Sequence, residues 1–197
     1  MNIKKIDKIF NDFYENNPLR FGIRKEEVYK HFDLPYEELL NIIKQYNEKY
    51  GFNGIVFYKK NREIFLNEKL ENLKNELLKY FVNINKLDLD YFEINFHINK
   101  KAILHTIHYL VDIGQLVELV KNTYYLKSQI FHKYLNIITN ELRIAPRETS
   151  YLKDKLELSR EKTIIFLEYL DYINITKFSN NKRYLINLPD NFIQFRH

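Results

Sequence analysis

The sequence contains no cysteine, which excludes disulfide bonds, thiolate metal sites and cysteine nucleophiles. Glycine and proline are also rare, with 4 of each among 197 residues. This composition argues against a β-sandwich rich in tight turns, a collagen-like chain or a glycine loop that cradles phosphate. No segment approaches the roughly 18 uncharged apolar residues of a membrane span. We therefore expect helices joined by short polar connections.

The residues that are present indicate a folded protein with a mild basic bias. Hydrophobic residues make up 45% of the chain and charged residues 29%, enough to bury real cores. The 31 Lys and Arg against 26 Asp and Glu give a net charge of +5, which permits a polyanionic partner without requiring one. The first residues lack the uninterrupted apolar stretch of a signal peptide, so we expect a cytoplasmic protein.

The strongest pattern is a threefold internal repeat of helices followed by a pair of β-rich runs. Each unit has a leading helix, predicted over Ile3–Glu15, Lys69–Phe81 and Ile130–Leu142. Each also has a later helix that opens with a Pro or a capping residue after an apolar one, at Leu34-Pro35, Ile98-Asn99 and Leu158-Ser159. These later helices are expected to end at Gly51, Gly114 and Asn174.

Asn-rich turns between β-branched and aromatic runs predict a hairpin in each unit. The distance from Leu66 to Leu126 is 60 residues, and the distance from Leu126 to Ile186 is again 60. The predicted strand pairs are Gly54–Tyr58 with Glu63–Leu66, Leu116–Val120 with Thr123–Leu126, and Ile175–Phe178 with Arg183–Ile186.

Helices followed by a hairpin are the plan of the winged helix. We predict a mainly α fold with small antiparallel β wings (α+β), made of three tandem winged-helix modules at residues 1–67, 68–128 and 129–197. The alternative is one mixed domain with three helical hairpins and β arms. A winged helix is only a fold, and many of them bind protein rather than nucleic acid.

Two segments carry a family resemblance. Residues 17–28, Asn-Pro-Leu-Arg-Phe-Gly-Ile-Arg-Lys-Glu-Glu-Val, resemble a stretch in the C-terminal region of bacterial selenocysteine-specific elongation factors (SelB). Residues 158–162 and 167–177, with Leu-Ser-Arg-Glu-Lys, Leu-Glu-Tyr-Leu-Asp and Ile-Thr-Lys, resemble the terminal winged helix of that family. The two segments stand in the family's order with one module between them, so the resemblance covers essentially the whole chain.

The resemblance implies a binding role without chemistry. Members of the family begin with a GTPase and tRNA-binding part and end in four winged helices, the last of which binds the selenocysteine insertion hairpin (SECIS) in the mRNA. This chain has no G-x-x-x-x-G-K-[ST] loop, so we expect a piece of such a factor that is not itself an enzyme. It is expected to need no cofactor, with GTP and Mg²⁺ in the missing part. The expected partners are the mRNA stem-loop and, through the full-length factor, the ribosome and selenocysteinyl-tRNA, with no membrane contact and a monomeric state.

A winged helix meets nucleic acid through the start of its recognition helix and through its wing, so we searched both for cations. Residues 129–197 carry 11 basic and 8 acidic residues, the largest positive excess of the three modules. Arg160 is the first choice for a phosphate or guanine contact, because its planar fork suits both. Glu168 and Asp171 on the same helix face are expected to repel phosphates. The predicted RNA-binding residues are Lys153, Ser159, Arg160, Lys162, Lys177, Lys182 and Arg183.

Other interpretations stay open or are set aside. A DNA-binding winged-helix regulator is the first alternative, although Glu161, Glu168 and Asp171 crowd its recognition helix. A protein-interaction scaffold is the second. His105, His108 and Asp112 have a spacing that could hold zinc, but no second cluster supplies further ligands, so we interpret the histidines as a surface pair.

Overall fold

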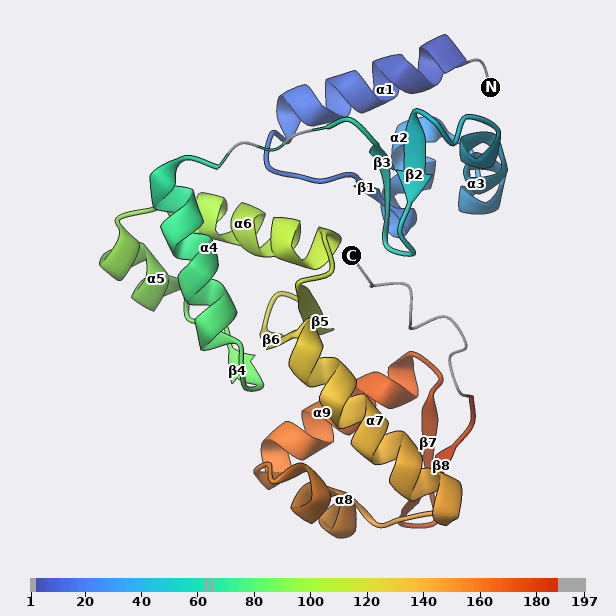
Figure 1. Cartoon of the computed structure of the whole chain (residues 1–197), viewed down its shortest axis with the longest axis vertical. Helices are drawn as coiled ribbons and strands as arrows, with labels where there is room; N and C mark the ends of the chain where they lie inside the picture. The colour runs from blue at the N-terminus through green and yellow to red at the C-terminus, as the bar shows by residue number, and fades with distance from the viewer. Residues whose placement is uncertain (1–2, 63, 65, 188–197) are drawn as a thin grey trace. The chain divides into compact units, whose positions relative to one another are not determined.

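The computed structural model describes residues 3–62, 64 and 66–187, and it repeats one order of elements three times (Figure 1). Each repeat has a leading helix, a short second helix, a recognition helix and a β-hairpin. The fold is therefore mainly α with small antiparallel sheets, and the predicted leading helices are confirmed. The first repeat contains α1 (Ile3–Asn16), β1 (Ile23–Arg24), the 3₁₀ turn η1 (Lys25–Glu27), α2 (Val28–Phe32), α3 (Tyr36–Gln45), β2 (Tyr50–Phe52) and β3 (Val56–Lys59).

The other two repeats follow the same order. In the first and middle repeats a short strand after the leading helix adds to the hairpin, so the sheets have the strand orders β1-β3-β2 and β4-β6-β5. In the third repeat a single bridge between Arg147 and Arg183 takes that place. The middle repeat contains α4 (Glu68–Tyr80), β4 (Asn85–Lys86), α5 (Leu89–Phe96), α6 (Lys100–Asp112), β5 (Leu116–Val120) and β6 (Tyr124–Lys127). The third contains α7 (Ser128–Ile144), α8 (Thr149–Leu156), α9 (Arg160–Tyr172), β7 (Thr176–Ser179) and β8 (Lys182–Leu185).

The same backbone pattern precedes each recognition helix. A left-handed residue ends the short second helix, an apolar residue follows, and an extended capping residue then starts the recognition helix. The short link lets the chain reverse direction without glycine, at some cost in backbone strain. The three left-handed residues are Asp33 (φ 54°), His97 (φ 50°) and Glu157 (φ 55°), and the capping residues are Pro35, Asn99 and Ser159.

The first hairpin differs from the prediction. β3 pairs with the preceding strand β2, and the turn lies at Asn53 and Gly54, where Gly54 has φ 91°. The Asn53 side chain accepts hydrogen bonds from the amides of Ile55 and Val56, which fixes this turn. Asn-Gly is a strong hairpin signal, and the prediction overlooked it in favour of Lys60–Asn61.

This correction removes the 60-residue spacing between the first and second repeats. Leu66 was compared with Leu126 and Ile186, but it follows β3 and lies outside any strand. The predicted strand Glu63–Leu66 includes residues 63 and 65, which lie outside the described residues. The recognition helix α3 also ends at Gln45 rather than at Gly51. The other two hairpins and their helix ends at Gly114 and Asn174 agree with the prediction.

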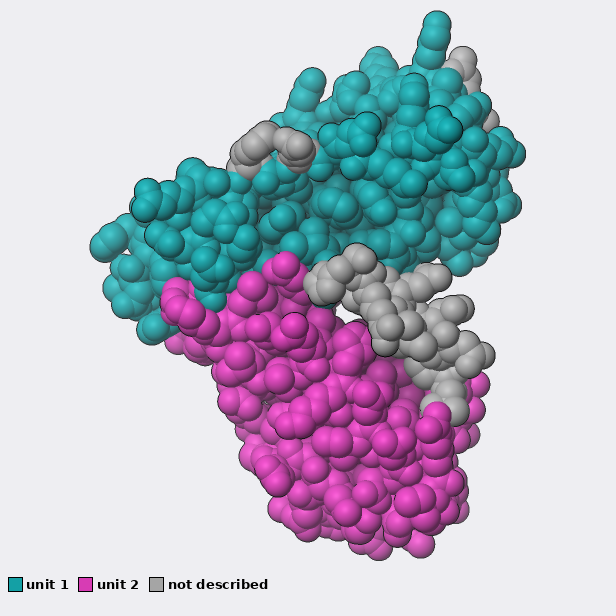
Figure 2. All heavy atoms as spheres, viewed as in Figure 1, with its two compact units in different colours: residues 1–75, 89–114 teal, residues 76–88, 115–197 magenta. Residues whose placement is uncertain are grey.

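Contacts within the chain define two compact units (Figure 2). Unit 1 consists of residues 1–75 and 89–114, and unit 2 of residues 76–88 and 115–197. The helices α5 and α6 thus belong to unit 1 with the first repeat, whereas the sheet β4-β6-β5 belongs to unit 2 with the third repeat. The domain boundaries after residues 67 and 128 follow the repeats and stay a prediction.

Aromatic rings fill the core of the first repeat. Phe10 is fully buried, and its ring lies 5.3 Å from that of Tyr50, 5.5 Å from Phe32 and 5.9 Å from Tyr14. Burying a side chain of this kind stabilises the fold by about 1.5–3 kcal/mol. These tyrosines and phenylalanines pack the interior and are not stacking surfaces for bases.

A buried carboxylate joins the first repeat to α6 within unit 1. Asp112 is fully buried and forms ion pairs with Arg20 (Nε to Oδ2, 3.0 Å) and Arg24 (Nε to Oδ1, 3.1 Å). Glu27 accepts from Arg20 Nη2 at 3.1 Å, and Asn53 Nδ2 donates to the Asp112 carbonyl at 2.8 Å. The predicted surface histidine pair thus lies on a helix whose Asp112 is a structural ion-pair partner rather than a metal ligand.

The SelB-like segment at residues 17–28 has a structural role in this network. It supplies Arg20, Arg24 and Glu27, and its Asn17 side chain donates to the Phe13 carbonyl at the end of α1. A Cβ at Gly22 would lie 2.2 Å from the Phe57 carbonyl oxygen, so only glycine fits this close approach. The segment therefore builds the first repeat and its contact with α6.

Candidate nucleic-acid interface

The start of α9 is a capped and accessible helix N-terminus. Ser159 has extended backbone angles, and its hydroxyl oxygen accepts from the amide of Lys162 at 3.3 Å. This confirms Ser159 as the N-cap. The first amides of a helix have no partner inside the helix, and the positive end of the helix dipole lies with them. The first turn of α9 can therefore receive a phosphate.

Arg160 is the first residue of this helix, and its side chain is exposed. Among the residues that the structure describes, no carboxylate forms an ion pair with its guanidinium. Its planar fork of donors therefore faces solvent beside the capped helix end. Of the predicted RNA-binding residues on α9, Arg160 is the one whose side chain is both exposed and without an ion-pair or hydrogen-bond partner in the described part of the chain.

The next two residues of α9 contact the middle sheet. Glu161 accepts a hydrogen bond from the Tyr124 hydroxyl at 2.9 Å, and Lys162 Nζ donates to Asn85 Oδ1 at 3.2 Å. The hydrogen bond that Glu161 accepts is the main cause of the raised pKa of Tyr124. Lys162 is half-buried and its ammonium makes this contact, so its role as an RNA ligand stays a prediction.

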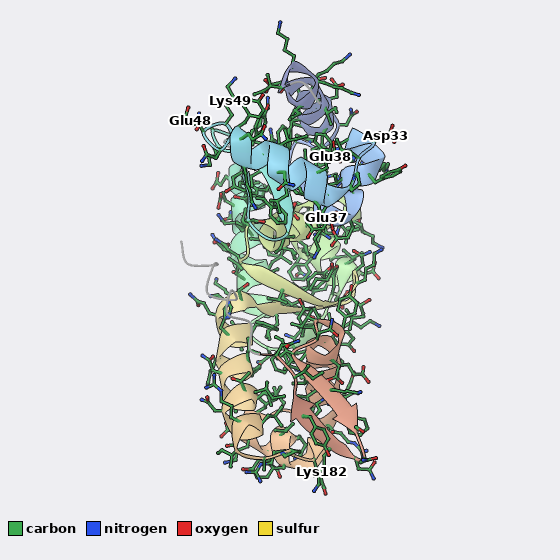
Figure 3. The ribbon with its side chains drawn as sticks, turned by 90° about the vertical axis from the view of Figure 1, so that its right-hand side faces the viewer. Asp33, Glu37, Glu38, Glu48, Lys49 and Lys182 are labelled. Carbon is green, nitrogen blue, oxygen red and sulfur yellow. The ribbon has the colours of Figure 1, made fainter. Side chains whose placement is uncertain are left out.

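The wing of the third repeat carries two exposed lysines on one face. Lys177 lies opposite Tyr184 and Ser179 opposite Lys182, so alternation along the strands places these four side chains together. Both lysines are exposed and form no ion pair with a described residue. Figure 3 labels Lys182 on this hairpin. The face is therefore positively charged, as predicted for an RNA-binding wing.

Tyr184 belongs to the same face, and the sequence interpretation missed it. Its side chain is 37% exposed, and its cross-strand partner is Lys177. A half-exposed ring between two lysines can stack on an unpaired base. The two-residue spacing from Lys182 is the sequence signal that could have found it.

Arg183 is turned to the opposite face and is 5% exposed. Its Nη2 lies 2.7 Å from Asp171 Oδ2, and its Nε donates to the same carboxylate. Asp171 also accepts from the Thr176 hydroxyl, and the guanidinium lies 5.4 Å from the centre of the Phe178 ring. Arg183 and Asp171, which we expected to attract and repel RNA, instead neutralise each other inside the wing.

Lys153 on α8 has a close partner of its own. Its Nζ lies 2.6 Å from Asp154 Oδ1, while its side chain remains 37% exposed. The neighbouring carboxylate weakens its attraction for phosphate, although the ammonium stays within reach of solvent. Its contact with RNA stays a prediction.

The starts of the other two recognition helices carry different charged groups. The first turn of α3 carries the exposed Glu37 and Glu38, both labelled in Figure 3. At the start of α6, Lys100 Nζ lies 2.5 Å from Asp90 Oδ1 and 3.7 Å from Glu93 Oε2. Lys101 in the same turn of α6 is exposed and forms no ion pair with a described residue, so an unpaired cation is present at the starts of α6 and α9 alike.

The described residues contain no group of three or more histidines and carboxylates arranged to hold a metal ion. None of the helices in the described part of the chain is long and apolar enough to cross a bilayer.

A family model and two solved structures are similar to this chain. Residues 147–185 match the family model described as the winged helix of elongation factor SelB. The mRNA-binding domain of SelB from E. coli, solved in complex with SECIS RNA, has a similar fold, with a TM-score of 0.51 and 18% identity over 62% of this chain and 100% of that one. A bacterial selenocysteine-specific elongation factor, EF-Sec, aligns with a TM-score of 0.47 and 24% identity over 93% of this chain, which spans 29% of that protein.

No curated protein matches the chain. The family model covers α8, α9 and the wing, the elements that carry the candidate interface. The chain is thus built of winged helices, and the resemblance to the C-terminal winged-helix region of SelB is confirmed.

Proposed function

We propose that this chain is the mRNA-binding part of a selenocysteine-specific elongation factor, and that its third repeat recognises a SECIS stem-loop. The observation that carries the proposal is Arg160, which is exposed and has no ion-pair partner among the described residues. It lies at a capped helix start within the segment that matches the SelB winged helix. The wing adds Lys177, Lys182 and Tyr184 on one face.

This combination suits an RNA hairpin better than a DNA duplex. The major groove of RNA is too deep and narrow for a helix to read, so proteins bind hairpins by phosphate contacts, shape and unstacked loop bases. The start of α9 offers one helical turn, an arginine and free amides, while the exposed Glu168 lies further along. Only the first turn would approach the RNA, and Arg160 would bind phosphate or guanine there.

The same proposal assigns the chain a role without catalysis. GTP, Mg²⁺ and selenocysteinyl-tRNA would bind the remainder of the factor, and the ribosome would be reached through that full-length factor. The chain would act as a monomer in the cytoplasm, where translation takes place. The first and middle repeats would connect the RNA contact to the GTPase part.

A titration with three ligands tests the proposal. The full chain is mixed with a bulged RNA hairpin, the same hairpin with a scrambled loop, and a DNA duplex of matched length, each over a range of salt concentrations. We expect tighter binding to the intact hairpin. The logarithm of the binding constant should fall linearly with the logarithm of the salt concentration. Its slope should be about 0.7–0.9 for each phosphate contact, with a few such contacts in all. Equal affinity for all three ligands would contradict the proposal and favour general binding of polyanions.

A further inference from the structure

The first turn of α9 is bound to two neighbouring strands of the middle sheet. The Tyr124 hydroxyl on β6 donates to Glu161, and Lys162 donates to Asn85 on β4. These residues all belong to unit 2, shown in magenta in Figure 2. The middle sheet therefore adjoins the surface at which we propose that RNA binds.

Lys86 brings a further cation to this place. It lies directly opposite Tyr124 in the antiparallel pairing of β4 with β6, so the two side chains share one face of the sheet. The Cβ atoms of such a pair are about 4.5–5.5 Å apart. Lys86 is exposed and forms no ion pair with a described residue. Because Tyr124 reaches Glu161, the strand that carries Lys86 lies beside the first turn of α9.

The backbone around Lys86 is held firmly. The Tyr80 hydroxyl donates to the Lys86 carbonyl at 3.1 Å, and Asn85 Nδ2 donates to the Tyr80 carbonyl at 2.6 Å. On the other side, the amide of Leu87 donates to the Thr123 carbonyl at 2.7 Å. The ammonium is thus carried by a fixed strand, which lowers the entropic cost of a contact with a ligand.

We propose that Lys86 contacts the phosphate backbone of the RNA that binds at the start of α9, so that the middle and third repeats share one interface. The inference rests on the proposed function. A stem of RNA is wider than one helical turn, and a ligand seated on Ser159 and Arg160 extends over the adjoining sheet. Glu161 alone would repel phosphate there, and the cation on the adjoining strand offsets its charge.

The contact has a defined consequence for recognition. A phosphate contact carries no information about base sequence but fixes the position of the RNA on the protein. Lys86 therefore contributes affinity and salt dependence for every hairpin that reaches it. Arg160 and the wing remain the groups that select the loop.

The experiment compares Lys86→Gln and Lys86→Arg with the unchanged full chain, using the bulged RNA hairpin as the probe. We expect Lys86→Gln to weaken binding about threefold to tenfold and to lower the salt slope by about 0.7–0.9, the value of one phosphate. Lys86→Arg keeps the charge and is expected to keep the affinity. Lys133→Gln, which removes an exposed lysine of α7, is the matched control and is expected to stay within about twofold.

Arg160→Ala separates the two proposals. Suppose that Arg160→Ala weakens binding but that Lys86→Gln weakens it no more than Lys133→Gln does. The shared interface is then wrong and the proposed function stands. A loss of affinity in Lys86→Gln without a change in salt slope also overturns the phosphate contact. If the unchanged chain prefers no hairpin over its scrambled form, the proposed function fails and this inference fails with it.

Discussion

Arg20 in unit 1 and Arg160 in unit 2 are both arginines of winged-helix repeats, yet they do different work. The Arg20 side chain is 11% exposed and is paired with two carboxylates, Asp112 and Glu27. Arg160 is exposed and has no ion-pair partner among the described residues. The comparison teaches that the location of a carboxylate in the fold, more than the basic residue itself, decides whether a cation builds structure or binds a ligand.

The largest effect is expected when the buried carboxylate is removed from the ion-pair cluster of Arg20, Arg24 and Asp112 in unit 1. Asp112→Ala leaves Arg20 and Arg24 without their shared buried partner, and we expect a loss of about 3–5 kcal/mol in the free energy of unfolding. Denaturant unfolding followed by circular dichroism measures it. Glu168→Ala, which removes an exposed carboxylate of α9, is the control. A loss below about 1 kcal/mol would show that the cluster does not hold unit 1 together.

The second test asks whether Asp171 is a structural ion-pair partner, as Asp112 is, or a free surface charge. Asp171→Ala removes the partner of the buried Arg183, and we expect a loss of about 2 kcal/mol in stability, because the Asp171 side chain is partly exposed. RNA affinity is not expected to improve. A variant of unchanged stability that binds the hairpin more tightly would mean that Asp171 acts as a free negative charge, as the sequence suggested.

The third test concerns Arg160 itself. Arg160→Ala is expected to cost about 1–3 kcal/mol in RNA binding, the usual value of a bidentate contact, while the midpoint of thermal unfolding stays the same. Fluorescence anisotropy with the labelled hairpin measures the affinity. Arg143→Ala removes another exposed arginine of unit 2 and serves as the reference. Equal effects of the two variants would remove Arg160 from the interface.

A smaller effect is expected at the N-cap of the same helix. Ser159→Ala removes the acceptor for the amide of Lys162 and should lower stability by about 1 kcal/mol. Ser159→Asp keeps a cap but adds a negative charge, so it should preserve stability and weaken RNA binding. Retained affinity in Ser159→Asp would indicate that phosphate does not approach this turn.

The smallest effect is a pH dependence of the unit 1 cluster. Burial raises the pKa of Glu27, but the ion pair and hydrogen bond with Arg20 outweigh it, so its pKa lies below the ordinary value. A carboxyl with a lowered pKa in the folded state stabilises the protein above its unfolded pKa of about 4.3 and loses that contribution as the pH falls. Unfolding between pH 6 and pH 3 should therefore show a shallower loss in Glu27→Gln than in the unchanged chain. Parallel curves would contradict this.

The helices were predictable because their signals are local. The apolar spacing and the caps at Asn99 and Ser159 depend on neighbours within a few residues, and the structure has those helices where we expected them. The first hairpin was mispredicted because two Asn-containing turns competed, and the pairing of β3 with β2 depends on which strand packs in the core. The two-residue strands β1 and β4 are too short to leave a sequence pattern.

The candidate site was only partly predictable. Position on the helix pointed to Ser159 and Arg160, and position beside the turn of the wing pointed to Lys177 and Lys182. The roles of Lys162 and Arg183 depend on partners 77 and 12 residues away in the chain, and no local pattern reports those pairs.

The sequence by itself determined the order of the helices, the caps that start them, two of the three hairpins and the resemblance to SelB, because all of these follow from short-range patterns. Only the tertiary structure decided which charges are free. It placed Asp112 between Arg20 and Arg24 and Asp171 against Arg183, and it left Arg160 in solvent. Desolvation is the physical reason, since a buried charge requires a partner of opposite sign and an exposed one does not.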